Sequence, residues 1–480
     1  MKDQGQPKLG TNWVLTEKII NGEHGVKARL TVRGDQEDTA NVRKDSPTVR
    51  KGNIKIFCAV AAKEGWSIKT NDVTCAFLQG APMEREVFVL PPKERRIPGI
   101  LWLLRKPVYG LADAARGWHL ALDKELTVDG CEKSRMDPAM YLYFSKEQGK
   151  RRIEGITLTH VDDLLDGGTQ KFEEKVMKKV KQAFEFSDEE VSNFRYVGMN
   201  MIQKGNGITI NQDHYIESLE LPDMQVAVNL KSDDVLCPEG QAEFRGCVAK
   251  ILYVGSQSRP DVSFEGKALS TKFGKATKGD LKSAMKKMLK LKGAETVMFF
   301  PDLGPVEDWS LIAYCDAGIR SLPDKINSVG GQVILLANLK NETACVLNWR
   351  AKKLKRKVVS SLAGEALAMV AVIGEVVYNK AILSQIYGDM INKLPAIVFT
   401  DSKNLHEAIY SSLLVDDAWL IPDVALIKEA KEQGTVSDIR RVSGKDMIAN
   451  CLTKAGASAE DLLYILHTGR YSLPVEVEES

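Results

Sequence analysis

Apolar and polar residues alternate over residues 156–160, and two leucines follow a pair of aspartates before the chain reaches two glycines. The stretch runs Gly155-Ile156-Thr157-Leu158-Thr159-His160-Val161-Asp162-Asp163-Leu164-Leu165-Asp166-Gly167-Gly168. This pattern predicts a β-hairpin with Asp162 and Asp163 at its tip. Neighbouring carboxylates repel each other unless a divalent cation absorbs the charge, and oxygen ligands suit Mg²⁺ or Mn²⁺. A solvated acidic turn is the alternative.

Two further stretches, over residues 12–20 and 25–34, predict short strands around a polar turn at 21–23. Alternation in the second strand puts four polar side chains on one face, namely those of Lys27, Arg29, Thr31 and Arg33. A row of cations makes a poor core but a suitable surface for phosphates. For each of these residues, a solvated strand face is the alternative.

Helices are predicted over 54–62 and 171–186, and the stretch 105–118 is expected to lead into a helix that runs to about Leu126. A strand over 86–90 is expected to stop at a proline pair. Residues 194–212 predict a hairpin, and the polar stretch 220–240 predicts a linker. Nine lysines follow in a region of helical pattern: Lys267, Lys272, Lys275, Lys278, Lys282, Lys286, Lys287, Lys290 and Lys292.

A third acid lies far upstream of the aspartate pair. Asp72 ends a strand-like stretch that begins near Trp66, and Phe77 follows five residues later. An acid after a strand, together with a hairpin that carries two more, favours a shared metal site over an isolated acidic turn.

The last third of the chain repeats this arrangement of strands and acids. Two predicted strands end in an acid, at Asp316 and Asp401, and a predicted helix over 360–372 carries Glu365 near its start. A serine pair can cap that helix. Acids at strand ends and in the first turns of a helix can converge on one point, although each alone is compatible with a plain surface carboxylate.

Composition limits the possible classes of protein. A chain of 480 residues exceeds one core and suggests about two to four domains. A net charge of only +2 means that a nucleic-acid partner requires local basic patches. Eight cysteines without a Cys-x-x-Cys spacing argue against disulfides and a zinc knuckle. Because no apolar run of bilayer length and no signal-like N-terminus are evident, we expect no membrane and a cytoplasmic or nuclear, reducing compartment.

The motifs around the acids resemble those of reverse transcriptases. Residues 72–80, Asp-Val-Thr-Cys-Ala-Phe-Leu-Gln-Gly, and 161–163, Val-Asp-Asp, are similar to palm motifs of copia-type LTR retrotransposon polymerases. The resemblance extends to residues 27–34 and 105–118, and residues 349–365 resemble the RNase H of that family. The chain therefore looks like the reverse transcriptase plus RNase H portion of a copia-type Pol polyprotein.

This resemblance implies an α+β fold, in which a right-hand polymerase of fingers, palm and thumb precedes an RNase H-like α/β domain with a mixed sheet. The implied boundaries are 10–220 for fingers and palm, 221–305 for the thumb or connection, 306–456 for the RNase H-like domain and 457–480 for a C-terminal tail. The nine lysines would then either follow a duplex backbone or form a solvated face.

The resemblance also assigns roles to individual residues. The implied catalytic and metal-binding acids form two trios: Asp72, Asp162 and Asp163, then Asp316, Glu365 and Asp401, with Asn450 at the position of a fourth RNase H acid. Each trio is expected to hold two Mg²⁺ ions, with Mn²⁺ as the alternative. The implied nucleotide-binding residues are Lys27, Arg29, Arg33, Phe77 and Asp113. The implied nucleic-acid-binding residues are Lys352, Lys353, Lys355 and Arg356, which as an alternative form a solvated basic turn.

The implied activity is RNA-directed DNA polymerisation with RNase H cleavage. Its implied partners are an RNA template, a DNA primer, an RNA–DNA hybrid and deoxynucleoside triphosphates, and the oligomeric state stays open. Phe77 is expected to exclude ribonucleotides by a clash with the 2′ hydroxyl.

Several positions depart from the family pattern. Asp113 replaces Gln, Ala115 replaces Pro, His160 replaces Tyr and Asn450 replaces Asp. A carboxylate at 113 is expected to disfavour nucleotide phosphates, and an amide at 450 to weaken one metal ion. These departures favour an alternative, namely a decayed retroelement copy that folds and binds nucleic acid without catalysis. A copy with RNase H activity alone is a further alternative.

Overall fold

The computed structural model describes all residues except 21, 22, 148, 188, 392, 414, 416 and 478–480. The chain forms two compact units, each made of two segments of the sequence. The first comprises Met1–Arg50 and Lys69–Val191, and the second comprises Lys51–Ile68 and Ser192–Ser480. The predicted boundaries at 220, 305 and 456 remain predictions. Two residues of the predicted turn at 21–23, and the last three of the predicted tail, lie outside the described residues.

The largest sheet of the first unit has six strands. They are β4 (Ser67–Asp72), β7 (Glu132–Lys133), β8 (Met140–Glu147), β9 (Lys150–His160), β10 (Asp163–Gly168) and β11 (Glu190–Val191), in the order β11-β4-β10-β9-β8-β7. β9 and β10 are antiparallel, and His160 pairs with Asp163 next to the turn. The predicted hairpin is therefore confirmed.

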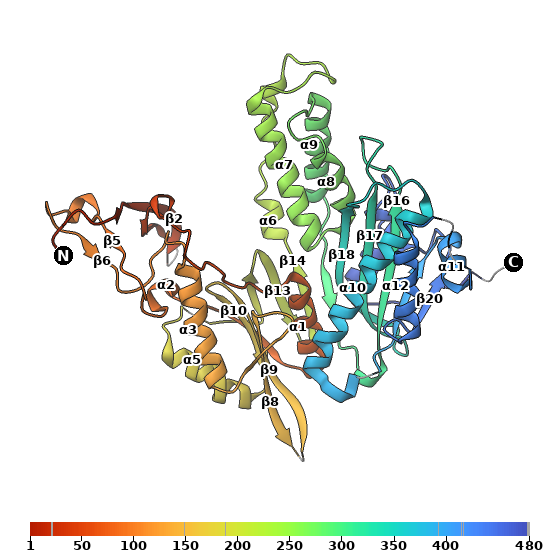
Figure 1. Cartoon of the computed structure of the whole chain (residues 1–480), viewed down its shortest axis with the longest axis horizontal. Helices are drawn as coiled ribbons and strands as arrows, with labels where there is room; N and C mark the ends of the chain where they lie inside the picture. The colour runs from red at the N-terminus through yellow and green to blue at the C-terminus, as the bar shows by residue number, and fades with distance from the viewer. Residues whose placement is uncertain are drawn as a thin grey trace. The chain divides into compact units, whose positions relative to one another are not determined.

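Helices pack against this sheet through an apolar core. The helical elements are α2 (Ala76–Gln79), α3 (Ala114–Val128), α4 (Gln170–Phe172), a π-helical turn (Glu173–Met177) and α5 (Lys178–Ala183). Trp118 of α3 and Phe172 of α4 lie in one buried cluster with Tyr141 and Leu164 of the sheet. Figure 1 shows α3 and α5 side by side. The helix predicted to run to about Leu126 is confirmed as α3, and the helix predicted over 171–186 is confirmed, although it ends at residue 183 and contains the π-helical turn.

The remaining strands of the first unit form two small sheets. β2 (Thr11–Ile20) pairs with β3 (Glu23–Val32), as predicted, and β1 (Lys8–Leu9), β5 (Phe88–Val89) and β6 (Trp102–Leu103) form a three-stranded sheet. Short 3₁₀ turns lie at Gly34–Gln36 and Lys93–Arg95. Val32, Val89 and Leu111 belong to the small core here. The strand predicted over 86–90 is reduced to two residues, which pair with β1 on one side and β6 on the other.

The second unit begins with helix α1 (Lys51–Glu64), which confirms the helix predicted over 54–62. All of residues 53–62 are buried. The Lys55 ammonium lies 3.5 Å from the centroid of the Trp349 ring. The Asn53 side-chain amide donates to the Tyr378 hydroxyl at 2.8 Å, and the Tyr387 hydroxyl donates to Glu64 at 3.1 Å. Aromatic residues late in the sequence therefore hold α1.

Four antiparallel strands follow, namely β12 (Asn193–Tyr196), β13 (Met199–Lys204), β14 (Gly207–Asn211) and β15 (Met298–Phe300). The single hairpin predicted over 194–212 is instead a three-stranded meander within this sheet. The extra turn arises because Val197 and Gly198 both have a positive φ, of 50° and 73°, which ends β12 after Tyr196.

A helical layer comes next in the second unit. It contains α6 (Asp213–Glu217), α7 (Pro238–Gln257), α8 (Ser263–Ser270) and α9 (Lys278–Lys292), with 3₁₀ turns at Met224–Ala227 and Pro260–Val262. Figure 1 shows α7 and α9 running alongside each other. The linker predicted over 220–240 is wrong, because Ala227 and Leu236 are buried in the core beneath α7. The many polar residues of this stretch gave no indication that Ala227 and Leu236 are buried.

The last part of the second unit is built on a five-stranded mixed sheet. Its strands are β16 (Trp309–Gly318), β17 (Val329–Asn338), β18 (Thr343–Lys353), β19 (Ala396–Thr400) and β20 (Asp438–Arg441), in the order β18-β17-β16-β19-β20. The first three are antiparallel, and β19 and β20 run parallel to β16. The helical elements here are α10 (Ser361–Tyr387), α11 (Lys403–Tyr410), α12 (Ile421–Glu432) and α13 (Glu460–Thr468), with 3₁₀ turns at Val306–Asp308, Gly388–Ile391 and Ile448–Leu452. The predicted mixed sheet is confirmed.

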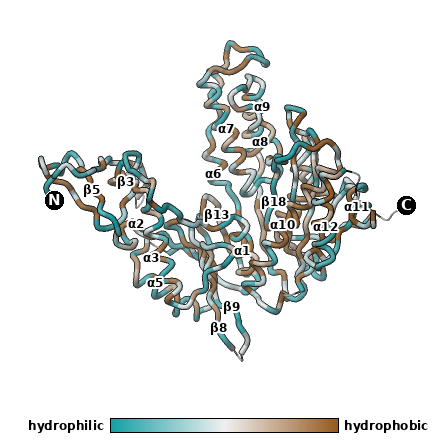
Figure 2. Tube along the Cα trace, in the orientation of Figure 1, coloured by the Kyte–Doolittle hydropathy of each residue, from teal (hydrophilic) through white to brown (hydrophobic). Residues whose placement is uncertain are grey.

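Helix α10 corrects the expectation that the chain has no apolar run of bilayer length. Ser361–Ile391 is long and apolar enough, with a mean hydropathy of 1.7 in its best window, to meet the length and composition of a membrane span. Half of that window is buried, because α10 packs against β16 and β17. Figure 2 shows hydrophobic residues concentrated along α10 and the neighbouring strands. All eight cysteines are free, as expected, and six of them are buried.

Candidate active sites

The three acids of the first trio meet at one end of the six-stranded sheet. Asp72 is the last residue of β4, Asp162 lies in the β9–β10 turn and Asp163 begins β10. β4 and β10 are neighbours in the sheet, and the Val73 amide donates to the Asp162 carbonyl oxygen at 3.3 Å. Strand pairing therefore brings an acid from residue 72 beside acids from residues 162 and 163.

Side chains behind the trio fix the hairpin. The Thr70 hydroxyl donates to the Leu164 carbonyl at 2.9 Å, and the Trp118 indole donates to the Val161 carbonyl at 2.6 Å. Val161 has φ of 60°, an unusual value for a β-branched residue, so this turn is tight. The anchoring bonds on both sides keep the aspartate pair at the strand end.

Electrostatics at this trio favour a cation. Burial, followed by the negative charges of Asp162 and Asp72, raises the pKa of Asp163 to about 6. The carboxylates thus repel one another, which a divalent ion would relieve. Asp72 is exposed, and Asp162 and Asp163 are half-buried. The donor set is of the kind that Mg²⁺ uses when substrate phosphates complete its coordination.

Tyr109 connects two predicted nucleotide-binding residues. The rings of Phe77 and Tyr109 lie 4.6 Å apart between centroids, and the Arg29 guanidinium carbon lies 5.9 Å from the Tyr109 centroid. The pKa of the Tyr109 phenol is raised by burial and by the nearby negative charge of Asp162. Gly110 holds Tyr109 in place, because its φ is 98° and a Cβ there would lie 2.0 Å from the Val32 carbonyl oxygen. Sequence reasoning quoted Tyr109 within a motif but gave it no role.

The other predicted nucleotide-binding residues have different surroundings. Lys27 is exposed on β3, and Arg33 forms an ion pair with Asp35 at 2.6 Å. Asp113 accepts two hydrogen bonds from the Arg85 guanidinium, at 2.8 and 2.9 Å.

Arg85 also pairs with Glu37, so one cation is shared between two carboxylates. The expected electrostatic penalty at Asp113 is therefore only partly relieved within the protein. Arg85 was missed in the sequence, since nothing in the pattern links residues 28 apart.

His160 stands beside the aspartate turn as a neutral group. Burial lowers the pKa of its imidazole, and within the described residues its Nδ1 atom is buried without a hydrogen-bond partner. A neutral ring at this position adds no charge to the trio.

The second trio is more tightly gathered. Asp316 lies near the end of β16, Asp401 follows β19, and Glu365 lies in the second turn of α10. Ligand oxygens of the three carboxylates all lie within 4.8 Å of one another, and this is the only such acidic, Cys or His group among the described residues. β16 and β19 are adjacent and parallel, so both strand-end acids emerge at the same edge of the sheet.

Local contacts place Glu365 in this trio. The Ser360 hydroxyl caps α10 by accepting from the Ala363 amide at 3.2 Å. One carboxylate oxygen of Glu365 accepts from the Ala317 amide at 3.2 Å. Its other oxygen, Oε2, is buried and has no hydrogen-bond partner among the described residues.

The charges in this trio are strongly unfavourable without a cation. Burial, followed by the charges of Asp316 and Asp401, raises the pKa of Glu365 to about 9. Burial and the Asp316 charge also raise the pKa of Asp401. Together with the unpartnered Glu365 oxygen, this arrangement fits a divalent metal ion with oxygen ligands.

Asn450 and its neighbours complete the surroundings of the second trio. The Lys454 ammonium lies 2.5 Å from Asn450 Oδ1, 3.2 Å from Asp316 Oδ1 and 3.8 Å from Asp401 Oδ2. The Thr453 hydroxyl donates to Asp316, and the Asn450 amide donates to the Gly444 carbonyl at 2.7 Å. Lys454 lies four residues after Asn450, and nothing in the sequence pattern indicated its contact with the trio.

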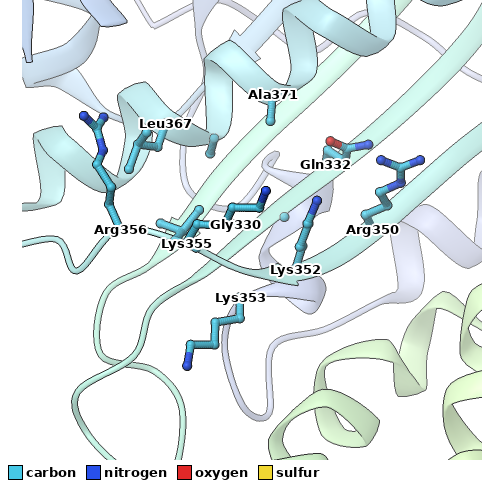
Figure 3. Close-up of a pocket in the computed structure, with 12 residues that line it drawn as sticks. Gly330, Gln332, Arg350, Lys352, Lys353, Lys355, Arg356, Leu367 and Ala371 are labelled. Carbon is cyan, nitrogen blue, oxygen red and sulfur yellow. The ribbon is translucent and has the colours of Figure 1, made fainter.

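The predicted nucleic-acid-binding residues line a pocket of about 250 Å³ between β17, β18 and the start of α10. Its basic lining residues are Arg350, Lys352, Lys353, Lys355 and Arg356. Figure 3 shows Arg350 and Lys352 extending to one side of β18 and Lys353 to the other. Arg350 pairs with Glu375 at 2.9 Å and Arg356 pairs with Asp423, whereas the three lysines have no carboxylate partner among the described residues.

The pocket and the second trio are neighbours in the fold. Gly331 lines the pocket and pairs with Asp316 across β16 and β17. Ala368 lines it from α10, within one turn of Glu365. A phosphate backbone held at this pocket would therefore pass close to the carboxylates.

Comparison with known proteins shows what the part of the chain that carries the first trio is similar to. Residues 2–229 match the family model described as reverse transcriptase (RNA-dependent DNA polymerase). The matched part of the chain contains Asp72, Asp162 and Asp163. The predicted resemblance to copia-type retrotransposon Pol polyproteins is confirmed over most of the chain.

Two curated relatives illustrate the extent of the similarity. The retrovirus-related Pol polyprotein from transposon RE1 of Arabidopsis thaliana is 26% identical over 474 residues, which cover 93% of this chain and 30% of that protein. The putative transposon Ty5-1 protein of Saccharomyces cerevisiae is 24% identical over 300 residues, which cover 59% of this chain and 92% of that protein. The chain thus spans about 30% of the length of the RE1 polyprotein.

Two solved structures are also similar in part. LC11-RNase H1 in complex with an RNA/DNA hybrid is 16% identical with a TM-score of 0.23, and the match covers 30% of this chain and 94% of that chain. The foamy viral protease-reverse transcriptase in complex with dsDNA is 10% identical with a TM-score of 0.23, covering 92% of this chain and 77% of that chain.

Proposed function

We propose that this chain is an RNA-directed DNA polymerase with an accompanying RNase H activity, from a retrotransposon. The observation that carries the polymerase part is the meeting of Asp72, Asp162 and Asp163 at one end of a sheet, within the stretch that matches the reverse transcriptase family. The proposed partners are an RNA template, a DNA primer and deoxynucleoside triphosphates.

In the polymerase site, Asp72, Asp162 and Asp163 are the residues that hold divalent cations, Mg²⁺ or Mn²⁺. When bound, such ions neutralise phosphate charge and lower the pKa of an attacking hydroxyl. The exposure of Asp72 leaves this edge of the sheet open to a nucleotide and a primer end. The raised pKa of Asp163 supports the proposal, because the trio lacks a balancing charge of its own.

Phe77, Tyr109 and Arg29 form the proposed nucleotide-facing group beside this trio. The two rings support each other at 4.6 Å, and the Arg29 cation lies close to the Tyr109 ring. A rigid aromatic surface is suited to excluding a 2′ hydroxyl, while Arg29 and the exposed Lys27 offer charge to a triphosphate. Arg33 and Asp113 are less available for this role, since each is engaged in an ion pair.

The proposed RNase H site uses Asp316, Glu365 and Asp401. Three observations support it: the strand order of the mixed sheet, the close approach of the three carboxylates, and the unpartnered oxygen of Glu365. A bound divalent ion would supply an activated water and charge stabilisation for hydrolysis of a phosphodiester. The Ala317 amide orients Glu365, and the Thr453 hydroxyl orients Asp316.

Lys352, Lys353 and Lys355 are the proposed contacts to the hybrid backbone. They surround the pocket next to the trio and are not neutralised by carboxylates within the described part of the chain. Arg356 is less available, because Asp423 already pairs with it. Each phosphate contact that these residues make would add to the salt dependence of hybrid binding.

Primer extension on a poly(rA) template with Mg²⁺ or Mn²⁺ tests the polymerase proposal. We expect extension by the parent chain and a loss of at least about 100-fold in Asp162→Asn, since changes at outer-shell residues of metal sites already cost about 10–100-fold. Glu190→Gln, at an exposed position of the same sheet, is the matched control and should retain activity. Absence of extension by a folded parent would contradict the proposal.

The second candidate is a decayed copy that binds nucleic acid without catalysis. The observation that favours it is the second trio, where Asn450 supplies no charge and instead contacts Lys454. The same assays separate the candidates, because a decayed copy binds hybrid but neither extends a primer nor cleaves the RNA strand. Hybrid cleavage that disappears in Asp316→Asn without primer extension would identify a copy with RNase H activity alone.

A further inference from the structure

The second trio contains a cation of the protein itself. The Lys454 ammonium lies 3.2 Å from Asp316 Oδ1 and 3.8 Å from Asp401 Oδ2, so one amine contacts two of the three acids. It also lies 2.5 Å from Asn450 Oδ1, the side chain that stands where a fourth acid is expected. No lysine had been assigned a role in this site.

The protein positions Lys454 through several independent contacts. Its backbone amide donates to the Asn450 carbonyl at 3.0 Å, which fixes the turn that carries it. The preceding residue, Thr453, is fully buried and donates its hydroxyl to Asp316. The Asn450 amide is held in turn by the Gly444 carbonyl at 2.7 Å. The amine is therefore directed into the trio by the local fold.

The positive charge of Lys454 limits how many divalent ions the second trio can balance. Three carboxylates and one ammonium carry a net charge of −2 when all are ionised, which a single divalent ion balances. Two divalent ions would add to the lysine charge and leave an excess of positive charge within a few ångströms. An acid at position 450 would shift this balance, but Asn450 is neutral.

We propose that Lys454 acts as a built-in cation of the second trio, so that the site binds one divalent ion where the resemblance implies two. Lys454 lies against Asp316 and Asn450, and Glu365, whose Oε2 atom lacks a partner among the described residues, would be a ligand of the single metal ion. This inference rests on the proposed RNase H site, in which the same acids hold metal.

Counting bound Mn²⁺ tests the inference without any measurement of cleavage. The full chain carries Asp162→Asn and Asp163→Asn so that the polymerase site does not contribute, and electron paramagnetic resonance of free Mn²⁺ gives the number of ions bound. We expect about one ion in this parent and about two after Lys454→Met or Lys454→Gln. Lys454→Arg, which keeps the charge, should stay at one.

Two controls interpret the count. Lys445→Met removes an exposed lysine from the same region and should leave the number of ions unchanged. Asp316→Asn should abolish binding. Circular dichroism tests whether each variant is folded. Two neutral substitutions, Lys454→Met and Lys454→Gln, are used so that the test still stands if one of them misfolds.

The outcomes separate the inference from the function on which it rests. If the parent binds two ions, or if neither neutral Lys454 variant gains an ion, the inference is overturned while the proposed metal site stands. If neither the parent nor the Lys454 variants bind Mn²⁺ in a way that Asp316→Asn removes, the proposed RNase H site itself fails.

Discussion

The two carboxylate trios differ in how completely the protein balances their charge. The first lies at an accessible sheet edge, with Asp72 exposed and with the pKa of Asp163 raised to about 6. The second is gathered within 4.8 Å, holds Glu365 at a pKa of about 9, and has the Lys454 amine against two of its acids. Both trios join acids that are remote in sequence through adjacent strands.

This difference indicates two ways to prepare a metal site. A trio at an open edge is suited to an ion that shares its coordination with incoming phosphates, because Mg²⁺ commonly combines one or two carboxylates with substrate oxygens. A buried trio is costly unless a cation is near, and Lys454 supplies one from the protein. Under the proposed function, the first site would be completed by its substrate, whereas the fold itself supplies a cation to the second.

The largest expected effect comes from disabling the trios one at a time. Asp162→Asn should remove primer extension by at least about 100-fold and leave hybrid cleavage within about twofold, and Asp316→Asn should do the reverse. The reason is that each trio is assembled by its own sheet. Parallel primer-extension and hybrid-cleavage assays measure both effects, and loss of both activities in either variant would contradict the independence of the sites.

Substitution of the aromatic group beside the first trio should have the next largest effect. Phe77→Val removes the ring that contacts Tyr109 and should raise ribonucleotide incorporation by roughly 10-fold or more relative to deoxynucleotides. Single-nucleotide incorporation with ATP and dATP gives the ratio. Leu78→Val, at the exposed neighbouring position, is the control, and an unchanged ratio in Phe77→Val would remove Phe77 from this role.

Restoring an acid at position 450 should increase the affinity of the second trio for Mg²⁺. Asn450→Asp adds a carboxylate next to Lys454, and extra ligand charge tightens the binding of hard cations. The Mg²⁺ concentration that gives half-maximal hybrid cleavage should fall by roughly tenfold. Asp446→Asn, four residues before Asn450, should not reproduce the effect, and an unchanged Mg²⁺ requirement in Asn450→Asp would count against a role for position 450.

The smallest expected effect concerns stability in the absence of metal. Because the pKa of Glu365 is raised from 4.5 to about 9 in the folded chain, the folded state holds a proton in this pH range that the unfolded state has lost. Stability without metal should therefore fall as pH rises from about 5 to 9. Glu365→Gln should flatten this dependence and raise Tm at pH 8, by about 2–4 °C per kcal/mol regained. Thermal unfolding of the parent and of Glu365→Gln in EDTA at several pH values measures this dependence. If Tm changes with pH in the same way in both proteins, the raised pKa of Glu365 is contradicted.

Much of each site could be predicted because its acids lie at the ends of regular elements. Alternation over 156–160 located the β9–β10 hairpin, and apolar runs that end in an acid located Asp316 and Asp401. The hydrophobic pattern alone did not show that these acids converge. The resemblance to copia-type polymerases grouped them into two trios. The mixed sheet followed for the same reason, since its strands are strongly apolar.

Contacts between distant side chains could not be predicted. The pairing of Arg85 with Asp113, and the approach of Lys454 to Asp316, depend on how loops close, and no local periodicity encodes that. The linker prediction failed for a related reason, because two apolar residues among many polar ones, Ala227 and Leu236, suffice to anchor a segment. The contacts that could not be predicted are therefore mainly ion pairs and apolar contacts between residues that are distant in the sequence.

Helix α1 limits how this chain can be divided. Residues 51–68 belong to the second unit although the segments before and after them belong to the first. A fragment that stops at residue 191 would retain α1 but lose Trp349, Tyr378 and Tyr387, which hold it in the whole chain. The buried residues 53–62 would then face water. Expression of residues 1–191 alone should accordingly give an aggregating product, whereas the full chain keeps this helix covered.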